Sequence, residues 1–179
     1  LGDEGGFAPS VKNVEERLEL LLKAVRETGY TGKIKLALDC AASEFYDEKN
    51  QKYTISNKKF DKNGLIDFYR SLIKKFPIVS IEDGFAQDDW GGWALFNREL
   101  GSSVQIVGDD LLVTNMARIR KAFQEKACNS LLLKVNQIGT VTEAIDAANL
   151  SFKNKWSVVV SHRSGETEDN FIADLCVGL

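Results

Sequence analysis

The sequence has little of what marks several large classes of protein. It contains one histidine, two prolines and three cysteines in 179 residues. No apolar run reaches the length of a membrane-spanning helix. Cys40, Cys128 and Cys176 lie far apart and form no CxxC pair, which argues against a disulfide framework and against a zinc site. We expect all three to be small buried hydrophobic residues in a reducing compartment.

Charge is not concentrated anywhere along the chain. The formal net charge is −3, and there is no basic run and no stripe of arginines with aromatic residues. These absences do not favour a nucleic acid or an anionic membrane as partner, and no segment has the pattern of a signal peptide. With 44% hydrophobic and 27% charged residues, the composition is that of an ordinary globular domain, for which a small-molecule site is the better default.

Short apolar runs alternate with amphipathic segments along most of the chain. The segments between the runs have helical periodicity, and two begin with capping-box pairs, Asn13 with Glu16 and Thr140 with Glu143. Residues 44–63 break the pattern and indicate a turn or a hairpin. Strand and helix alternate with a period of roughly 25 to 40 residues, which predicts a parallel α/β architecture. The apolar runs are KIKLALD, PIVSIED, VQIVGDD, SLLLKVN and WSVVVSH.

Two parallel folds fit this alternation, an open doubly wound sheet and a (β/α) barrel. The sequence has no GxGxxG motif after a first strand and no GxxxxGK[ST] motif. A complete eight-stranded barrel takes about 250 residues, so five strands favour part of a barrel. The chain opens on Leu1 and ends in FIADLCVGL, which is typical of a helix cut in mid-course. We therefore expect a piece of a longer protein.

Three successive predicted strands end on an acid, namely Asp39, Glu82 and Asp109. The carboxyl ends of parallel strands converge on one face of the fold, where active sites are built. Three carboxylates brought together repel one another unless a cation lies among them, and oxygen ligands favour Mg²⁺, or Mn²⁺ in its place. The alternative is that each acid caps the following helix, a role for which Asp83 and Asp110 are the more natural residues.

The next strand carries a lysine at the corresponding position. In SLLLKVNQ, Lys134 lies on the face opposite Leu131 and Leu133. A lysine in so apolar a strand must pair with an acid, reach the end of the sheet, or act as a base. Nearby divalent cations would favour its neutral form, which a general base needs. A salt-bridged lysine without a catalytic role remains the alternative.

The last predicted strand delivers the only histidine, His162, followed by Arg163 and Ser164. An arginine, a hydroxyl and free backbone N–H groups at the start of a helix suit a phosphate. At the other end of the chain, GDEGGFAP holds Glu4 among glycines, where an acid could donate a proton, although such a stretch is also an ordinary surface turn. Together these residues indicate a Mg²⁺-dependent barrel enzyme that removes a proton next to the carboxylate of a phosphorylated substrate.

The sequence closely resembles the enolase family. The stretches that carry the resemblance are GDEGGFAP, LDCAASEFY, SIEDGFAQDDW, QIVGDDLLVTN, LLLKVNQIGT and VVVSHRSGETEDNFIADL. The resemblance implies an α/β fold, a partial TIM-type (β/α) barrel in which residues 1–179 are the central segment of the C-terminal catalytic barrel domain. The family's N-terminal domain and its C-terminal barrel strands would then be absent from this chain.

The resemblance also implies the chemistry. The family catalyses the reversible dehydration of 2-phosphoglycerate to phosphoenolpyruvate in glycolysis and gluconeogenesis, as a carbon–oxygen lyase called phosphopyruvate hydratase. Asp39, Glu82 and Asp109 match the ligands of the tightly held Mg²⁺, of two Mg²⁺ ions per active site in the complete enzyme. Lys134 matches the base that removes the C2 proton, and Glu4 matches the acid associated with the leaving C3 hydroxyl.

The remaining implied residues concern the substrate. His162 lines the substrate pocket in the family, while Arg163 and Ser164 match residues that bind the phosphate. Gly84 replaces a proline found in many members. The resemblance further implies a cytoplasmic homodimer, the phosphopyruvate hydratase complex, with no nucleic acid and no membrane-spanning segment.

Two other functions remain open. One is a non-catalytic binding or structural form of an enolase, although every matching chemical residue is intact. The other, a different metal-dependent acid-sugar lyase of the same superfamily, is disfavoured by HRSGE and KVNQIGT. We expect the isolated chain to be inactive, because removal of the flanking strands leaves open sheet edges that favour aggregation.

Overall fold

The computed structural model describes residues 1–2 and 5–179. At its centre is a five-stranded parallel sheet with the strand order β1-β5-β6-β7-β8. Each strand coincides with one of the five apolar runs, so the predicted parallel α/β architecture is confirmed. The strands are β1 Leu36–Asp39, β5 Ile78–Glu82, β6 Gln105–Gly108, β7 Ser130–Leu133 and β8 Ser157–Val160.

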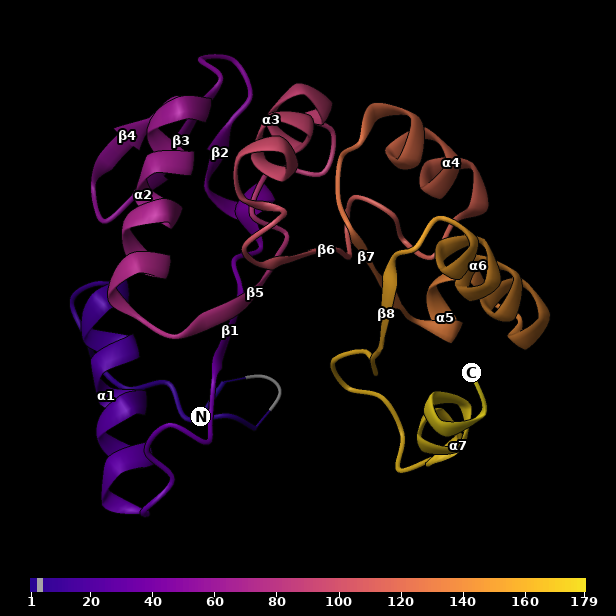
Figure 1. The fold of residues 1–179 in the computed structure, drawn as a ribbon, viewed down its shortest axis with the longest axis horizontal. Helices are drawn as coiled ribbons and strands as arrows, with labels where there is room; N and C mark the ends of the chain where they lie inside the picture. The colour runs from indigo at the N-terminus through magenta and orange to yellow at the C-terminus, as the bar shows by residue number, and fades with distance from the viewer. Residues whose placement is uncertain (3–4) are drawn as a thin grey trace.

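The strand order distinguishes between the two folds that the sequence allowed. A doubly wound sheet reverses its order at a switch point, whereas here each strand of the sheet is hydrogen-bonded to the strand of that sheet that precedes it in the chain. When every connection steps to the next strand on the same side, the sheet curves into a barrel with the helices outside it. Figure 1 shows such an arc, with α2, α3, α4 and α6 around its outer side. The partial (β/α) barrel is therefore confirmed.

The helices follow the periodic segments closely. Side-chain caps start most of the longer ones, because the first turn of a helix has N–H groups without helical partners. Asp61 accepts from the backbone of Gly64, and Asn115 accepts from that of Arg118. The helices are α1 Val14–Glu27, α2 Lys62–Lys75, α3 Trp90–Leu100, α4 Met116–Glu125, α5 Val135–Ile138, α6 Val141–Lys153 and α7 Phe171–Gly178.

Both predicted N-cap residues accept from the backbone N–H of the expected glutamate, but neither glutamate carboxylate completes the capping box by accepting from the N-cap backbone N–H. At the start of α6, Thr140 Oγ1 accepts from the Glu143 backbone N–H and donates to the Glu143 carboxylate at 2.7 Å. At the start of α1, Asn13 accepts from the Glu16 backbone at 2.9 Å, but the Glu16 carboxylate accepts from the backbone of Lys12 rather than Asn13. Each helix thus begins where its sequence signal predicted.

Residues 44–63 form the predicted excursion from the barrel. A 3-10 turn, Ala42–Phe45, leads into a three-stranded antiparallel sheet of β2 Tyr46–Asp47, β3 Lys52–Ile55 and β4 Lys58–Phe60. Tyr53 anchors this small sheet to the loop after β5. Its buried hydroxyl donates to Asp89 at 2.9 Å and accepts from the Ala86 backbone at 3.1 Å.

The hydrophobic core lies between the strands and their outer helices. Ile81, Trp93 and Phe96 are fully buried in it, and the ring of Phe96 contacts Phe85 with 5.5 Å between centroids. Gly84 makes room for this packing, because a Cβ there would lie 2.8 Å from Phe96 Cε1. Gly84 therefore fits a large aromatic neighbour.

The cysteine prediction is partly wrong. Cys128 is buried, but Cys40 is only half-buried and Cys176 is exposed. Cys176 lies on α7, where Leu175 is the buried residue, so the next side chain along the helix points away from the core.

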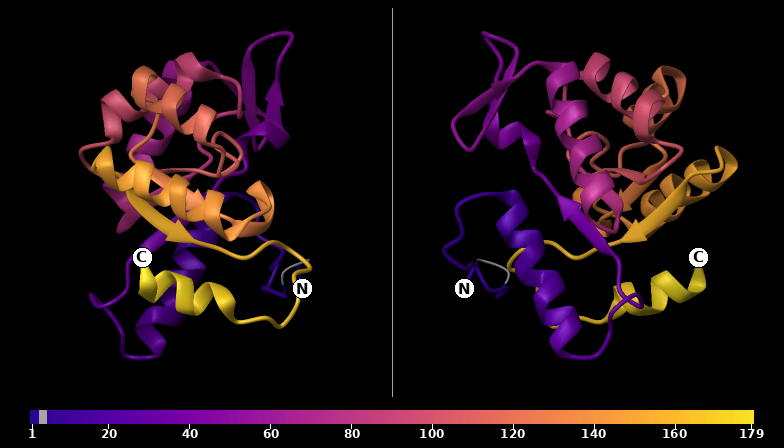
Figure 2. Two further views of the ribbon diagram at one scale, coloured as in Figure 1. Left: turned by 90° about the vertical axis from the view of Figure 1, so that its right-hand side faces the viewer. Right: turned by 60° about the vertical axis from the view of Figure 1, so that its left-hand side comes forward.

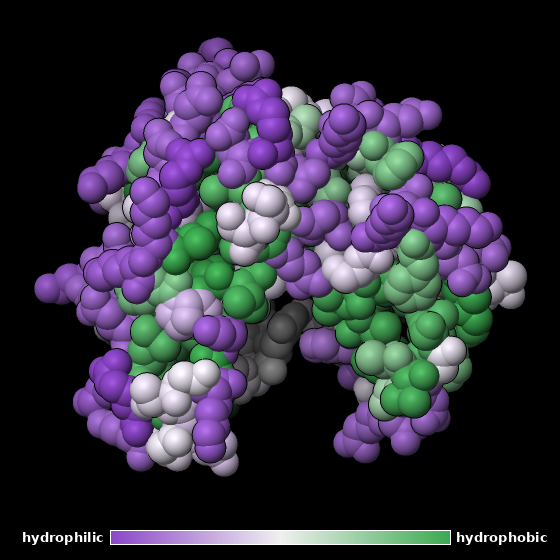
Figure 3. Space-filling view, in the orientation of Figure 1, coloured by the Kyte–Doolittle hydropathy of each residue, from purple (hydrophilic) through white to green (hydrophobic). Residues whose placement is uncertain are grey.

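Helices α1 and α7 lie at the two ends of the arc (Figures 1 and 2). Figure 3 shows a notch between these ends with hydrophobic residues on both sides of it. Large hydrophobic side chains are exposed on both helices, including Leu21 at 53% and Val177 at 89%. Within residues 1–2 and 5–179, no helix has the length and apolarity needed to cross a bilayer.

Candidate active site

The acids that end β1, β5 and β6 lie at one end of the sheet. Asp39 and Glu82 are direct register partners on neighbouring strands, and Glu82 is paired in turn with Val107, two residues before Asp109. Asp39 is exposed, Glu82 is half-buried and Asp109 is buried. The strands therefore bring the three predicted ligands to the same edge, as parallel pairing requires.

Asp83, the acid that directly follows Glu82 at the end of β5, has a structural role. Asp83 is 4% exposed and has a positive φ of 43°. Its carboxylate accepts from the backbone N–H groups of Asp109 at 3.0 Å and Asp110 at 2.9 Å. Burial raises the pKa of Asp83 to about 7. Asp83 thus joins the carboxyl ends of β5 and β6 and fixes the backbone that carries Asp109.

The electrostatics at this edge favour a cation. Burial, followed by the charges of Asp39 and Asp109, raises the pKa of Glu82 to about 8. Partial desolvation and the charge of Asp109 also raise the pKa of Asp39. Neighbouring carboxylates shift in this way because each ionised group disfavours ionisation of the next.

A group of carboxylates close enough to share a metal ion also exists at this edge. One oxygen from each of Asp83, Asp109 and Asp110 lies within 4.8 Å of the others. This group shares Asp109 with the predicted ligand set but contains Asp83 and Asp110 in place of Asp39 and Glu82. Both oxygens of Asp83 already accept backbone N–H groups, so a cation would compete with those bonds. Asp109 is the one residue common to both sets.

Lys134 follows β7 directly and faces the same acids. Its ammonium Nζ lies 2.5 Å from Asp109 Oδ2, and the two side chains are 14% and 12% exposed. The strand ends at Leu133, so Lys134 occupies the residue before α5 rather than the strand itself. The lysine pairs with an acid and also reaches the end of the sheet, two of the three arrangements that the sequence allowed.

Two polar residues that sequence reasoning did not identify complete this cluster. Gln137 Nε2 donates to Asp109 Oδ1 at 3.0 Å, and Thr114 Oγ1 accepts from the Lys134 backbone N–H at 2.9 Å. Gln137 stands three residues after Lys134 in the KVNQ stretch, which was the available signal. Thr114 sits in an apolar loop after β6 and carries no pattern of its own.

The loop after β8 presents the predicted phosphate-binding residues on the surface. His162, Arg163 and Ser164 are all exposed. Burial and the charge of Asp109 raise the pKa of Asp110, and the charges of Lys134 and Arg163 partly oppose this rise.

The local structure of this loop differs from the prediction. Helix α7 begins only at Phe171, so the HRSG segment does not lie at a helix start. Instead the Glu166 backbone N–H donates to Arg163 O at 3.1 Å, and the Arg163 backbone N–H donates to the Glu166 carboxylate at 2.8 Å. The expectation of helical N–H groups for a phosphate is therefore wrong. The polar run from Thr167 to Asn170 remains a loop.

Glu166 also joins this loop to the lysine segment. Its other carboxylate oxygen accepts from Asn136 Nδ2 at 3.1 Å. Sequence reasoning did not identify Glu166 as part of the site. The predicted proton donor Glu4 lies outside the described residues.

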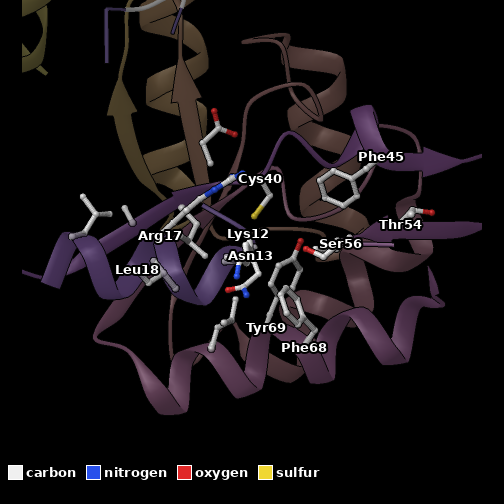
Figure 4. Close-up of a pocket in the computed structure, with 17 residues that line it drawn as sticks. Lys12, Asn13, Arg17, Leu18, Cys40, Phe45, Thr54, Ser56, Phe68 and Tyr69 are labelled. Atoms are coloured by element: carbon white, nitrogen blue, oxygen red, sulfur yellow. The ribbon is translucent and has the colours of Figure 1, made fainter. Parts of the chain in front are cut away.

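A cavity of about 540 Å³ lies between α1, β1, α2 and the small sheet. Figure 4 shows Lys12, Arg17, Cys40 and Tyr69 around it. Asp39 also lines this cavity, whereas Glu82, Asp109 and Lys134 do not. The cavity therefore shares Asp39 with the predicted ligand set and none of the other three residues.

Comparison with known proteins gives a family match over the whole chain. The model described as "Enolase, C-terminal TIM barrel domain" matches residues 1–179. An enolase from Thermococcus gammatolerans is 59% identical over 181 residues, and an enolase from Thermococcus kodakarensis is 58% identical over 181 residues. Each alignment covers 100% of this chain and 42% of the relative, so the chain spans about two-fifths of the length of these curated relatives.

Proposed function

The chain belongs to the enolase C-terminal TIM barrel domain family, and on that premise we propose that it is the central segment of the catalytic barrel of a phosphopyruvate hydratase. The full-length protein, meaning a polypeptide of the relatives' length that contains these residues, interconverts 2-phosphoglycerate and phosphoenolpyruvate in glycolysis and gluconeogenesis. The observation that carries this proposal is the Lys134–Asp109 pair at the carboxyl ends of the strands, 2.5 Å apart and largely shielded from water.

The donor set fits a hard divalent cation. Asp39, Glu82 and Asp109 would hold Mg²⁺, because they offer only oxygen ligands. Burial, together with the charges of Asp39 and Asp109, raises the pKa of Glu82 to about 8, and a cation would offset this cost of ionisation. When bound, Mg²⁺ stabilises negative charge on the substrate carboxylate, and a second Mg²⁺ is expected with the substrate. Asp83 keeps the backbone of Asp109 and Asp110 in place beneath these ligands.

Lys134 is the proposed base for the C2 proton. In the described structure its ammonium donates to Asp109 Oδ2, so the proton-accepting form requires loss of this ion pair. The backbone of Lys134 is held independently by Thr114, which keeps the side chain aimed at the same edge when the ion pair is broken. Glu4 is the proposed acid for the leaving C3 hydroxyl.

The loop after β8 would bind the other end of the substrate. Arg163 offers a planar set of charged donors for a phosphate, and His162 and Ser164 lie beside it in the chain. All three are exposed in the described structure and therefore accessible to a ligand. We further propose, from the family match, that the full-length protein is a cytoplasmic homodimer. The exposed apolar side chains on α1 and α7 are expected to be covered in that protein.

The test is formation of phosphoenolpyruvate from 2-phosphoglycerate by the full-length protein, followed by ultraviolet absorbance. We expect Mg²⁺-dependent activity that a chelator abolishes, and no activity from the isolated 179-residue chain. A folded full-length protein without activity would favour the non-catalytic binding or structural form instead.

Replacement of the base sharpens this test. Lys134→Ala should lower exchange of the C2 proton with solvent by at least about 10³-fold, within the range for loss of a general base. Mg²⁺ binding should persist, because Lys134 is not a proposed ligand. Lys153→Ala is the matched control, since Lys153 is an exposed lysine on α6 outside the cluster. Exchange at the unmodified rate in Lys134→Ala would remove Lys134 from the mechanism.

A further inference from the structure

A chain of hydrogen bonds runs behind the Asp109–Lys134 pair. Gln137 Nε2 donates to Asp109 Oδ1 at 3.0 Å, and Gln137 Oε1 lies 3.2 Å from Thr114 Oγ1. Thr114 Oγ1 accepts from the backbone N–H of Lys134 at 2.9 Å. This series of hydrogen bonds therefore begins at the Asp109 carboxylate and ends at the backbone of Lys134, whose ammonium is ion-paired with that carboxylate.

The chemistry of the groups favours one arrangement of these bonds. An ionised Asp109 accepts but cannot donate, so Gln137 turns its NH₂ group toward it. The Gln137 carbonyl oxygen then faces Thr114 and is the nearer acceptor for its single hydroxyl proton, at 3.2 Å. The competing acceptor, Leu132 O, is farther away at 3.4 Å. The orientation of each side chain thus follows from that of its neighbour.

This arrangement divides the two oxygens of Asp109. Oδ1 is occupied by Gln137 on one side, while Oδ2 faces the Lys134 ammonium at 2.5 Å. We propose that Gln137 and Thr114 are positioning residues that leave Oδ2 of Asp109 as the oxygen presented to Lys134 and to a bound divalent cation. The inference rests on the proposed function.

The surroundings of Thr114 support a positioning role. Its side chain is fully buried, and both it and Val113 have positive φ values, of 54° and 42°. β-Branched residues rarely adopt this strained conformation. The loop after β6 nonetheless holds Thr114 in this positive-φ conformation, which places its hydroxyl between Lys134 and Gln137.

The experiment uses variants of the full-length protein and Mg²⁺ alone as the probe, titrated calorimetrically without substrate. Gln137→Met removes the donor at similar side-chain length, and we expect it to weaken Mg²⁺ binding by about 10-fold, the lower end for loss of a ligand-orienting partner. Thr114→Val should weaken binding less, and Thr114→Ser, which keeps the hydroxyl, should restore it. Gln124→Met is the control, because Gln124 is exposed on α4.

The kinetics and the melting temperatures separate a positioning role from a purely structural one. If Gln137 and Thr114 position Asp109, the variants should lower kcat for phosphoenolpyruvate formation more than they change KM for 2-phosphoglycerate, and their melting temperatures should stay near that of the unmodified protein. A purely structural role would lower the melting temperatures instead. Unchanged Mg²⁺ binding in Gln137→Met, or equal damage from Thr114→Ser and Thr114→Val, would overturn the inference. If Thr114→Val does not fold, Mg²⁺ binding by Gln137→Met is the deciding measurement, because Gln137 is only half-buried and its replacement is better tolerated.

The two proposals fail separately. Weakened Mg²⁺ binding in Gln137→Met of a protein that makes no phosphoenolpyruvate would support the positioning role and refute the proposed activity. An active protein whose Gln137→Met variant binds Mg²⁺ normally would refute the positioning role and support the proposed activity.

Discussion

Two regions carry residues of the candidate site, but they are built differently. One is the acid cluster, meaning Asp83, Asp109 and Lys134 at the ends of β5, β6 and β7, and the other is the loop after β8. In the cluster, the hydrogen bonds of Asp83, Asp109 and Lys134 join residues 20 to 28 positions apart, and most of these groups are shielded from water. In the loop, His162 and Arg163 are exposed and bond to residues one to three positions away. The contact between Glu166 and Asn136 is a longer-range exception.

The difference follows from the position of each strand in the sheet. Strands β5, β6 and β7 have a neighbour on both sides, so the loops at their ends meet one another. Strand β8 is at an edge of the described sheet and pairs only with β7. Asp83, Asp109 and Lys134 are therefore positioned by contacts between neighbouring strand ends, whereas His162 and Arg163 are positioned mainly by local hydrogen bonds.

The largest expected effect comes from removing Asp83, which ties the cluster together. Asp83→Ala leaves the buried N–H of Asp109 and the partly buried N–H of Asp110 without this acceptor, at about 1–3 kcal/mol for a buried group, and places alanine at a positive φ. We expect the free energy of unfolding of the full-length protein to fall by about 2–5 kcal/mol. Chemical denaturation measures this loss.

The control for this change is Asp83→Asn, because asparagine tolerates positive φ and keeps one acceptor oxygen. About half of the loss should remain. A loss below about 1 kcal/mol for Asp83→Ala would show that the N–H groups of Asp109 and Asp110 find other partners, and would weaken the distinction between cluster and loop.

A smaller effect is expected from Arg118, which braces the loops next to the cluster. Its guanidinium donates to Leu111 O, to Gln87 O at 2.9 Å and to Asp88 at 3.0 Å. The side chain is 30% exposed, so solvent screens part of this interaction. We expect Arg118→Ala to lower the free energy of unfolding by about 1–2 kcal/mol.

Arg120→Ala provides the comparison for Arg118, because Arg120 is an exposed arginine on the same helix. Its replacement should change the free energy of unfolding by less than about 0.5 kcal/mol. Equal effects of the two changes in denaturation would mean that the bonds from Arg118 do not brace the loops.

Much of the fold could be predicted from local patterns. The five apolar runs became the five parallel strands, and the capping pairs at Asn13 and Thr140 became helix starts. These signals are short-range, so they need no knowledge of tertiary contacts. The register of Asp39 with Glu82 also follows from aligning strand ends.

The parts that could not be predicted depend on contacts distant in sequence. Gln137 and Thr114 meet Asp109 and Lys134 only because β6 and β7 are neighbours, and neither residue type marks such a role. The loop after β8 was misjudged for the opposite reason. Its turn is closed locally by Glu166, so HRSG lies in a turn, and the helix expected to follow it begins only at Phe171.

The smallest effect on stability is expected in that loop, and it tests the comparison most directly. Glu166→Ala removes acceptors for the Arg163 backbone and for Asn136, all at exposed positions. We expect the free energy of unfolding to change by less than about 0.5 kcal/mol. Amide hydrogen exchange of residues 161–167 should nevertheless rise by about 2- to 10-fold, because one hydrogen bond is worth about 0.5–1.5 kcal/mol of local opening, while exchange in β6 stays unchanged. Glu168→Ala, at another exposed glutamate of the loop, should alter neither quantity. A loss of more than about 2 kcal/mol in Glu166→Ala would mean that the loop is as firmly integrated as the acid cluster, because changes at exposed positions seldom cost so much.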